Sequence, residues 1–262
     1  MKKGFLRLLL PPRLIPLARL LYYRPRALLF VGNQVICPFC GAHLRCFLPY
    51  SGSQNALCPY CFTLARHRTL WFYLLEHTNL FSERLRVLHV APEYALQRKL
   101  RACPNLDYTS ADLTSVEAME YMDITAIPYA DKTVDVILCS HVLEHIPDDR
   151  KAMREICRIL KPGGWAILLV PFDPNRATTL EDPSIVDPRE RERLYGQPDH
   201  VRLYGKKDYI ARLKQAGFTV TVSVPASTLD PSLIERHGLQ TDMTIFHCTK
   251  LADVAANAGF VK

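Results

Sequence analysis

Acidic residues are missing from the first 75 positions of the chain. Glu76 is the first of them, whereas ten Lys and Arg residues precede it. All 26 acidic residues and only 23 of the 33 basic residues follow, so the net charge of +7 originates at the amino end. Such a basic end predicts an anionic partner, either RNA, an anionic membrane surface or a phosphorylated substrate. A basic tail that only improves solubility is the alternative.

Long uncharged apolar runs are also missing. None reaches the roughly 18 residues that a membrane-spanning helix needs, so we expect no such helix. The nine cysteines make an odd number, and five of them are scattered through apolar patterns, which is typical of reduced thiols rather than of a disulfide framework. We therefore expect the protein in the cytoplasm, either free or peripheral at the membrane. The sequence does not indicate an oligomeric state.

Residues 1–32 form a basic amphipathic arm in which Arg and Leu alternate between prolines. The prolines and Arg13 interrupt the apolar run, and no small-residue cleavage site follows, which argues against a signal peptide. Tyr22 and Tyr23 would suit a segment that lies in a membrane interface. Packing on the rest of the chain and disorder are the alternatives.

Residues 33–64 carry two CxxC pairs separated by 17 residues. Four thiolates at this spacing can converge on one tetrahedral Zn²⁺, which would be structural because no coordination position stays open. The predicted ligands of this zinc ribbon are Cys37, Cys40, Cys58 and Cys61. Residues 65–84 are expected to form a connecting helix, and its basic start, Arg66–Arg68, would contact nucleic acid or face solvent.

From residue 85 to residue 262 the chain alternates between apolar strand patterns and amphipathic helix patterns. This alternation predicts an α/β fold, a Rossmann-like doubly wound sheet of seven strands, with the zinc ribbon as a small amino-terminal module. In the segment 134–170, a strand, the helix 148–160 and a second strand from Trp165 form one βαβ unit, with Pro162-Gly163-Gly164 ending the helix. The other predicted strands are 85–90, 106–111, one within 119–124, 218–224 and 243–250.

The sequence VLEHIPD…LKPGGW within this unit resembles the late motifs of class I S-adenosylmethionine-dependent methyltransferases of the type 11 group. The resemblance implies S-adenosylmethionine as the cofactor. Asp112 would then accept hydrogen bonds from the ribose, Asp123 would accept one from the adenine amino group, and Ile124 would add a backbone and apolar contact. The residues that the resemblance places against the cofactor are His89, Ala91, Glu93, Asp112, Leu113, Asp123, Ile124, Ser140 and His141.

The chain departs from this family in its first motif. The matching residues, Val87–Ala95, lack all three glycines that let the backbone approach the cofactor, and His89 replaces the usual acid. Glu93 would instead hold the amino group of the methionine moiety. The alternative is a domain that has lost its cofactor.

Residues 172–205 are too long for a plain connection and predict a lid. His200 is the first candidate for a general base, followed by His141 and His145, because imidazole titrates near neutral pH. Arg202 and Tyr204 are predicted to bind the substrate, Arg202 through a phosphate or carboxylate. A structural His200 that pins the lid is the alternative.

The sequence thus predicts a methyltransferase that acts on a small-molecule or glycan-like acceptor. One alternative is an RNA methyltransferase that binds RNA with its basic zinc-ribbon end. The segment Ser140–Leu143 lacks the motif of amino-group methylases, which argues against it. The other alternative is a non-catalytic binding or scaffold protein with a degenerate domain.

Overall fold

The structure is a computed structural model that describes residues 28–50 and 52–252. The chain divides into two compact units, each built from separate stretches. The first unit contains the amino-terminal module, residues 91–121 and residues 222–245. The second unit contains residues 85–90, 122–221 and the stretch from Phe246.

The main sheet has seven strands in the order β13-β14-β9-β8-β5-β6-β7. β5 pairs in parallel with β8, β8 with β9, and β6 with β7, whereas β14 runs antiparallel to β9. The predicted fold class is therefore confirmed: a mostly parallel, Rossmann-like sheet of seven strands. The strands are β5 (Leu85–Val90), β6 (Leu106–Asp112), β7 (Glu120–Tyr121), β8 (Val134–Ser140), β9 (Leu160–Leu169), β13 (Phe218–Ser223) and β14 (Ile245–Lys250).

The first unit carries the helices and the short hairpins of the amino-terminal module. β1 pairs with β2 and β3 pairs with β4, both antiparallel. Trp71 lies between Phe39 and Phe81, with ring centres 5.1 and 5.0 Å away, so aromatic packing joins the module to α2. The elements are β1 (Val31–Ile36), β2 (His43–Leu44), β3 (Leu48–Tyr50), β4 (Ser53–Leu57), α2 (Ala65–His77), α3 (Tyr94–Arg101) and α7 (Pro231–His237), with 3-10 turns η2 (Leu28–Phe30) and η4 (Pro225–Ser227).

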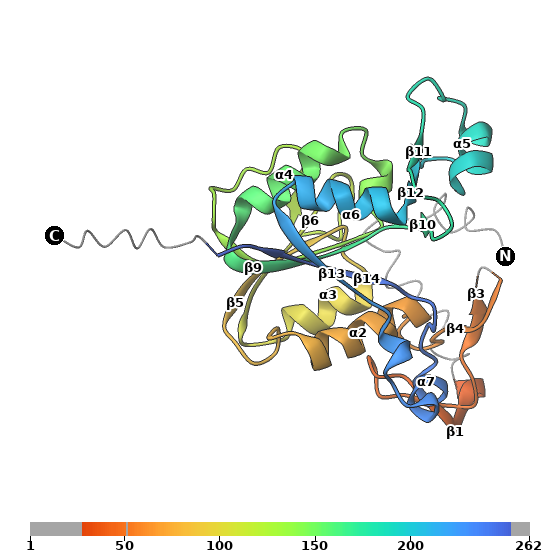
Figure 1. The fold of residues 1–262 in the computed structure, drawn as a ribbon. Coiled ribbons are helices and arrows are strands. Elements are labelled where there is room, and N and C mark those ends of the chain that lie inside the picture. Colours follow the sequence, from red (N-terminus) through yellow and green to blue (C-terminus); the bar gives the residue numbers. More distant parts are fainter. Residues whose placement is uncertain (1–27, 51, 253–262) are drawn as a thin grey trace. The chain divides into compact units, whose positions relative to one another are not determined.

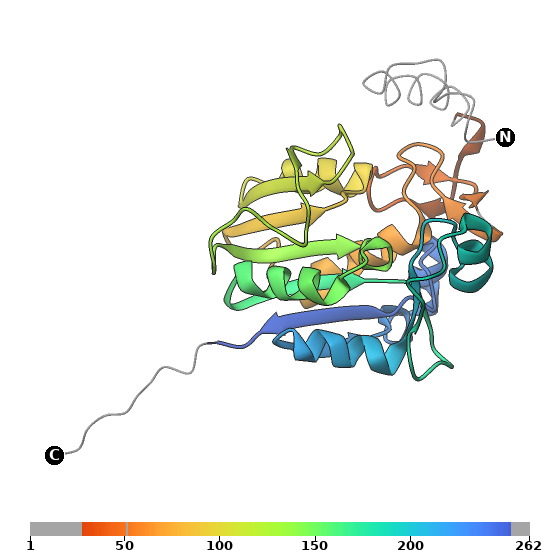
Figure 2. The same ribbon diagram turned by 90° about the horizontal axis from the view of Figure 1, so that it is seen from above.

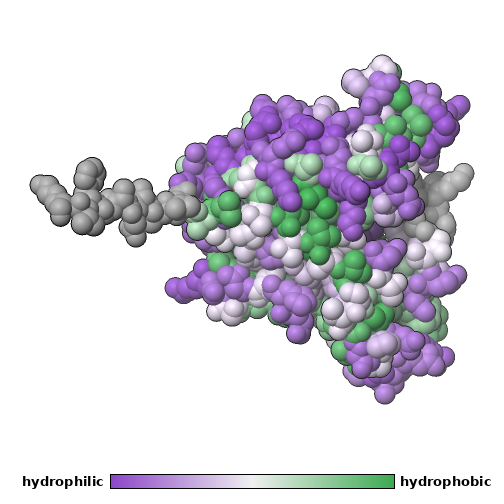
Figure 3. Space-filling view, in the orientation of Figure 1, coloured by the Kyte–Doolittle hydropathy of each residue, from purple (hydrophilic) through white to green (hydrophobic). Residues whose placement is uncertain are grey.

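The second unit holds the predicted lid. Its residues form a three-stranded sheet in the order β10-β12-β11 and a helix, α5, whose visible surface in Figure 3 is mainly hydrophilic. Two further helices, α4 and α6, contact each other and lie on the same side of the sheet (Figures 1 and 2). The elements are η3 (Leu143–His145), α4 (Asp149–Ile159), β10 (Phe172–Asp173), β11 (Leu180–Glu181), α5 (Pro188–Tyr195), β12 (Arg202–Gly205) and α6 (Lys206–Gln215).

Local sequence explains the boundaries of α4. The Asp148 side chain accepts a hydrogen bond from the Lys151 amide at 2.9 Å, which caps the first turn. Met153, Ile156 and Cys157 lie on one helical face and are buried, as their spacing predicts.

The prediction that Pro162-Gly163-Gly164 ends this helix is wrong. α4 already ends at Ile159, and β9 follows directly. The glycines instead lie where the pairing of β8 with β9 is irregular. A Cβ atom on Gly164 would lie 2.8 Å from the Asp135 carbonyl oxygen, so only glycine fits there.

The predicted amphipathic arm falls almost entirely within residues 1–27, outside the described residues, so its partner stays a prediction. Between residue 28 and residue 252, position 51 aside, no helix has both the length and the apolar character needed to cross a bilayer.

Candidate functional sites

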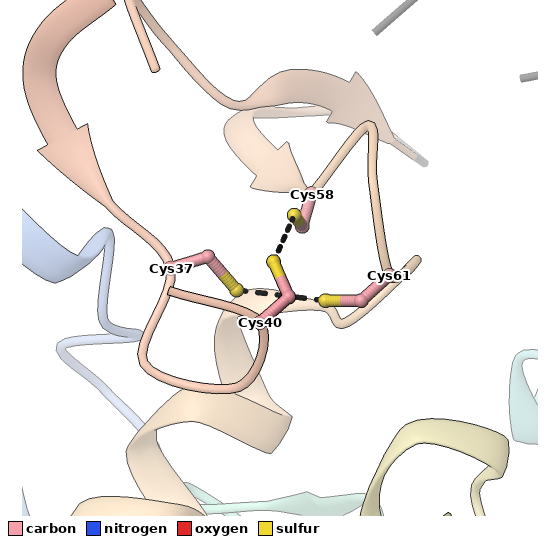
Figure 4. Close-up of side chains that lie close together, drawn as sticks. All are labelled: Cys37, Cys40, Cys58 and Cys61. Carbon is pink, nitrogen blue, oxygen red and sulfur yellow. Dashed lines mark hydrogen bonds between the residues drawn. The ribbon is translucent and has the colours of Figure 1, made fainter. Parts of the chain in front are cut away.

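The four predicted metal ligands converge in the first unit (Figure 4). Their sulfur atoms all lie within 4.8 Å of one another, with 3.5 Å between Cys37 and Cys61 and 3.7 Å between Cys40 and Cys58. Hydrogen bonds from neighbouring thiols, that of Cys40 foremost, lower the pKa of Cys37, whereas the same cluster raises the pKa of Cys58. The cluster is compatible with zinc held by four thiolates.

The two cysteine pairs share one turn geometry. The Gly41 amide donates to the Cys37 carbonyl at 2.9 Å, and the Phe62 amide donates to the Cys58 carbonyl at 3.0 Å. Gly41 has φ 69°, the positive value expected for a glycine after the first pair. Phe62 adopts φ 62° at the equivalent position without being glycine. The second turn therefore carries backbone strain, which tertiary packing must offset.

Arg68 is fully buried beside the cysteine cluster. The sequence predicted that this residue faces solvent or contacts nucleic acid, and for Arg68 both predictions are wrong. Its guanidinium lies 3.8 Å from the Phe47 ring centre. Burial lowers the pKa of Arg68, while the nearby thiols, Cys37 first, act in the opposite direction. Its N–H groups donate to the backbone carbonyl oxygens of Asn55, Ala56, Thr63, His237 and Gly238, and the last two residues are distant in the sequence.

Asp112 lies at the carboxyl end of β6, where the resemblance places the ribose ligand. Its Oδ1 atom accepts the amide hydrogens of Thr114 and Ser115, both at 2.7 Å. These bonds fix the carboxylate and involve only one of its two oxygen atoms. The orientation of Oδ2 is thus fixed, but these two bonds do not use it. A carboxylate that binds a ligand needs such an oxygen atom.

Ala91 follows β5 and has φ 48°, in the left-handed region. Its amide donates to the Ala111 carbonyl at 2.8 Å. The backbone turn that glycine normally provides in this motif is therefore present, although alanine occupies the position. The conformation costs about 1–2 kcal/mol for a residue with a Cβ atom.

The remaining predicted cofactor residues differ in accessibility. His89 and Ile124 are buried, at 1% and 3% exposure, so a contact with their side chains requires a ligand that reaches the interior. Glu93 precedes the first turn of α3, and Leu113 is exposed. The Asp123 carboxylate accepts the Thr125 amide hydrogen at 2.8 Å, and this backbone bond lowers its pKa. Their roles stay predictions.

All three histidines predicted as catalytic lie around one buried carboxylate, Glu144, in the second unit. His141 Nδ1 is 3.3 Å from Glu144 Oε1, although the geometry is not that of a hydrogen bond. Glu144, His145 and His200 each place one nitrogen or oxygen atom within 4.8 Å of the others. His141 has φ 56° and is 38% exposed in its side chain, whereas His200 is only 2% exposed. Ser140, the last residue of β8, is half-buried and precedes this turn.

Arg202 and Tyr204, predicted to bind the substrate, are buried and have structural partners. Arg202 donates to the carbonyl oxygens of Leu143 and Pro147 and to the Glu181 carboxylate. It also donates to the Ile146 carbonyl. The Tyr204 hydroxyl donates to Asp149 at 2.7 Å. This geometry does not support substrate contact; it clamps the segment that carries Glu144 and His145.

Glu144 and Asp149 were missing from the sequence-based assignment. Glu144 stands next to His145 in the VLEHIPD motif, and an acid beside a histidine shortly after a strand pattern was the available signal. In the sequence, Asp149 looks like an ordinary acidic residue in the first turn of a helix. Only its contacts with Tyr204 and Arg212, some 60 positions later in the chain, distinguish it.

Comparison with known proteins agrees with this fold. Residues 93–168 match a family described as a methyltransferase domain. The uncharacterised methyltransferase YcgJ of Bacillus subtilis is 37% identical over 82 residues, which are 27% of this chain and 32% of that protein. A probable S-adenosylmethionine-dependent methyltransferase of Mycolicibacterium smegmatis is 32% identical over 85 residues, 29% of this chain and 33% of that protein. The chain thus spans about a third or less of the length of the curated relatives it matches.

Among solved structures, an S-adenosylmethionine-dependent methyltransferase from Mesorhizobium loti is similar, with a TM-score of 0.50 and 14% identity over 70% of this chain and 98% of that one. At this identity the likeness shows the fold alone. The domain match and the relatives together support a class I methyltransferase.

Proposed function

We propose that this protein transfers a methyl group from S-adenosylmethionine to a small-molecule or glycan-like acceptor. The domain match over residues 93–168 and the sheet order support the reaction class. The observation that carries the proposal is the Asp112 carboxylate, because it is fixed at the carboxyl end of a parallel strand. Ligands of doubly wound sheets bind at such ends.

The residues present fit the cofactor at two positions. A ribose offers two adjacent hydroxyl donors, and Asp112 Oδ2 is oriented to accept from them because Oδ1 is held by two backbone amides. Ala91 takes the left-handed turn that glycine usually supplies. The glycine-free motif is therefore compatible with retained cofactor binding.

S-adenosylmethionine supplies a sulfonium methyl group when it is bound. The chain must then hold the acceptor nucleophile in line with that methyl, and such orientation can supply roughly 7–11 kcal/mol of the rate enhancement. His141 is the most exposed histidine of the cluster around Glu144 and follows β8 directly. We assign acceptor contact to His141 and His145, and a positioning role to Arg202 and Tyr204.

The cysteine cluster is proposed to hold a structural Zn²⁺. Its four thiols leave no coordination position for a substrate. A Zn²⁺ with four thiolates has a net charge of −2, and the buried Arg68 guanidinium offsets part of it. This arrangement favours a folding role for the metal.

Isothermal titration calorimetry with S-adenosylmethionine and its demethylated product tests the proposal. We expect the full chain to bind both, and Asp112→Ala to weaken binding at least tenfold, because a carboxylate that accepts ligand hydrogen bonds is worth roughly 1.5–3 kcal/mol. Asp107→Ala is the matched control, since Asp107 is an exposed acid near the amino end of the same strand. The control should bind like the wild type.

Absence of binding to the wild type would refute a catalytic role and favour the scaffold alternative. Normal binding by Asp112→Ala would refute only the ribose assignment. A screen of small metabolites and glycans with labelled methyl donor then identifies the acceptor.

The RNA alternative loses one of its three clustered basic residues, because Arg68 is buried. Salt-sensitive RNA affinity together with methylated RNA in the same screen would reinstate that alternative.

A further inference from the structure

Glu144 and His200 lie in the second unit with unusual hydrogen bonding. Glu144 is 1% exposed and His200 is 2% exposed. Both carboxylate oxygens of Glu144 and the Nε2 atom of His200 are buried and have no hydrogen-bond partner, and the one facing histidine nitrogen at Oε1 is His141 Nδ1 at 3.3 Å. Leaving buried polar groups without hydrogen bonds costs several kcal/mol, and native proteins rarely do so without a reason.

The backbone determines the tautomer of His200. Its Nδ1 atom lies 3.0 Å from the Tyr195 carbonyl oxygen, which can only accept, so Nδ1 carries the proton. Nε2 therefore presents a lone pair to the interior. A carbonyl or carboxylate that holds one imidazole nitrogen is the usual arrangement around a metal-ligating histidine.

His145 has the same arrangement. Its Nδ1 atom faces the Asp199 carbonyl oxygen at 3.3 Å and the Asp199 carboxylate at 3.5 Å, which leaves Nε2 as an acceptor. The His145 and His200 rings meet edge-on, with centres 4.8 Å apart. One ligand atom from each of Glu144, His145 and His200 lies within 4.8 Å of the other two. Each of these three residues therefore offers one acceptor atom, and a cation bound by all three would satisfy them.

We propose that Glu144, His145 and His200 form a second metal site, which binds a divalent transition metal ion. Two imidazoles and one carboxylate are a donor set that suits Zn²⁺, Mn²⁺, Fe²⁺ and Co²⁺ and leaves coordination positions open. His145 is 31% exposed in its side chain, so solvent reaches the cluster at this residue. The site is distinct from the four-thiolate cluster, which lies in the other unit.

The fold holds these ligands in place. Arg202 donates to the backbone carbonyls of Leu143 and Pro147, on either side of Glu144 and His145. The Val201 amide donates to the Glu144 carbonyl at 2.9 Å, which joins this turn to the residue after His200. Pre-positioned ligands lower the cost of metal binding.

The metal would bind an oxygen atom of the methyl acceptor, and this role rests on the proposed function. A divalent ion would lower the pKa of a bound hydroxyl group, so that its proton passes to solvent water and its oxygen becomes the better nucleophile. This oxygen would form the new O–CH3 bond as the S–CH3 bond of S-adenosylmethionine breaks. Metal binding itself does not depend on that reaction.

Titration of the as-purified full chain with Co²⁺ tests the site. Cobalt bound by nitrogen and oxygen ligands gives visible absorption without the near-ultraviolet sulfur-to-metal bands of a thiolate site. We expect the wild type to bind one equivalent of cobalt with this spectrum. Glu144→Gln should weaken the affinity for this cobalt ion at least tenfold. Glu192→Gln, an exposed acid on α5, should bind like the wild type.

His145→Ala provides a second variant, because this half-exposed side chain can be removed with little effect on folding. It should also lose the cobalt site while circular dichroism and the cysteine-bound metal stay unchanged. The proposal would be overturned if the wild type bound no nitrogen- and oxygen-ligated equivalent of cobalt, or if Glu144→Gln bound cobalt as tightly as the wild type. Calorimetry with S-adenosylmethionine on the same samples separates this failure from failure of the proposed function.

Discussion

Arg212 and Asp149 form a buried ion pair in which Nη1 donates to Oδ2 at 2.9 Å, with both side chains about 5% exposed. The same guanidinium reaches Glu181 on β11 at 2.6 Å and Asp208 on its own helix at 2.9 Å. Arg212 therefore joins α6 to the start of α4 and to the lid sheet. The acceptors on all sides fix the guanidinium plane.

Replacement of Asp149 by Asn should destabilise the protein by about 3 kcal/mol. The variant leaves a buried cation without its most deeply buried carboxylate partner, and removal of one member of a buried pair is far more costly than removal of both. Urea unfolding followed by circular dichroism measures the difference. Asp208→Asn, at the more exposed end of the same guanidinium, should cost less than about 1 kcal/mol. Equal losses would contradict the central position of Asp149.

Glu181 should make stability depend on pH in acid. Burial raises its pKa, but the hydrogen bonds from Arg212 and Arg202 outweigh this and lower the pKa to about 2 from its ordinary 4.5. Because the folded value is the lower one, the stabilisation is complete above pH 4.5 and is lost as the pH falls towards 2. Glu181→Gln should flatten the pH dependence of unfolding free energy in that interval, whereas Glu192→Gln should leave it unchanged. An unaltered slope in the first variant would exclude this carboxylate as the cause.

Replacement of Ala91 by Gly should raise stability by about 1 kcal/mol. The residue has φ 48°, which glycine adopts without the Cβ clash that alanine suffers. Ala95→Gly is the matched control, because Ala95 lies in the first turn of α3 and glycine there should cost up to about 1 kcal/mol. Thermal unfolding of the two variants shows whether each substitution raises or lowers the stability. Destabilisation by both variants would show that the turn after β5 is not strained.

Loss of one thiolate should release the metal of the cysteine cluster. We expect Cys37→Ser to contain less than half of the wild-type zinc by elemental analysis and to unfold at a lower temperature, since metal binding contributes directly to the folding of such modules. Cys46→Ser should keep the metal, because Cys46 lies outside the cluster. A metal-free wild type that stays folded would disprove the zinc assignment.

Much of the fold follows from local patterns. The strands at 85–90 and 134–140 and the helix that begins after Asp148 arise from runs and periodicities of apolar residues, and the structure reproduces them within one or two positions. The short strands of the lid were not predicted, because two-residue strands carry no periodicity. The turn at Pro162 was misread since Gly-rich sequences serve helix ends and strand irregularities alike.

For the candidate sites as well, some features could be predicted from the sequence and others could not. The spacing of the CxxC pairs predicted the four-cysteine cluster, because two sulfurs on one tight turn already supply half of the ligands of a tetrahedral metal site. The charge of Arg202 and Arg68 suggested contacts with a ligand, but both side chains are buried and donate hydrogen bonds to other groups of the protein. The charge of a residue in the sequence does not show whether its side chain will be buried.

By itself, the sequence determined the order of strands and helices, the four-cysteine cluster and the family resemblance, since each depends on residues that lie close together or recur at a fixed period. Only the tertiary structure decided that His200 meets Glu144, that Arg212 meets Asp149 and that Arg68 fills the interior beside the cysteines. Such contacts join residues far apart in the chain. They depend on how complete elements pack, because a buried polar group is stable only where its partners are brought to it.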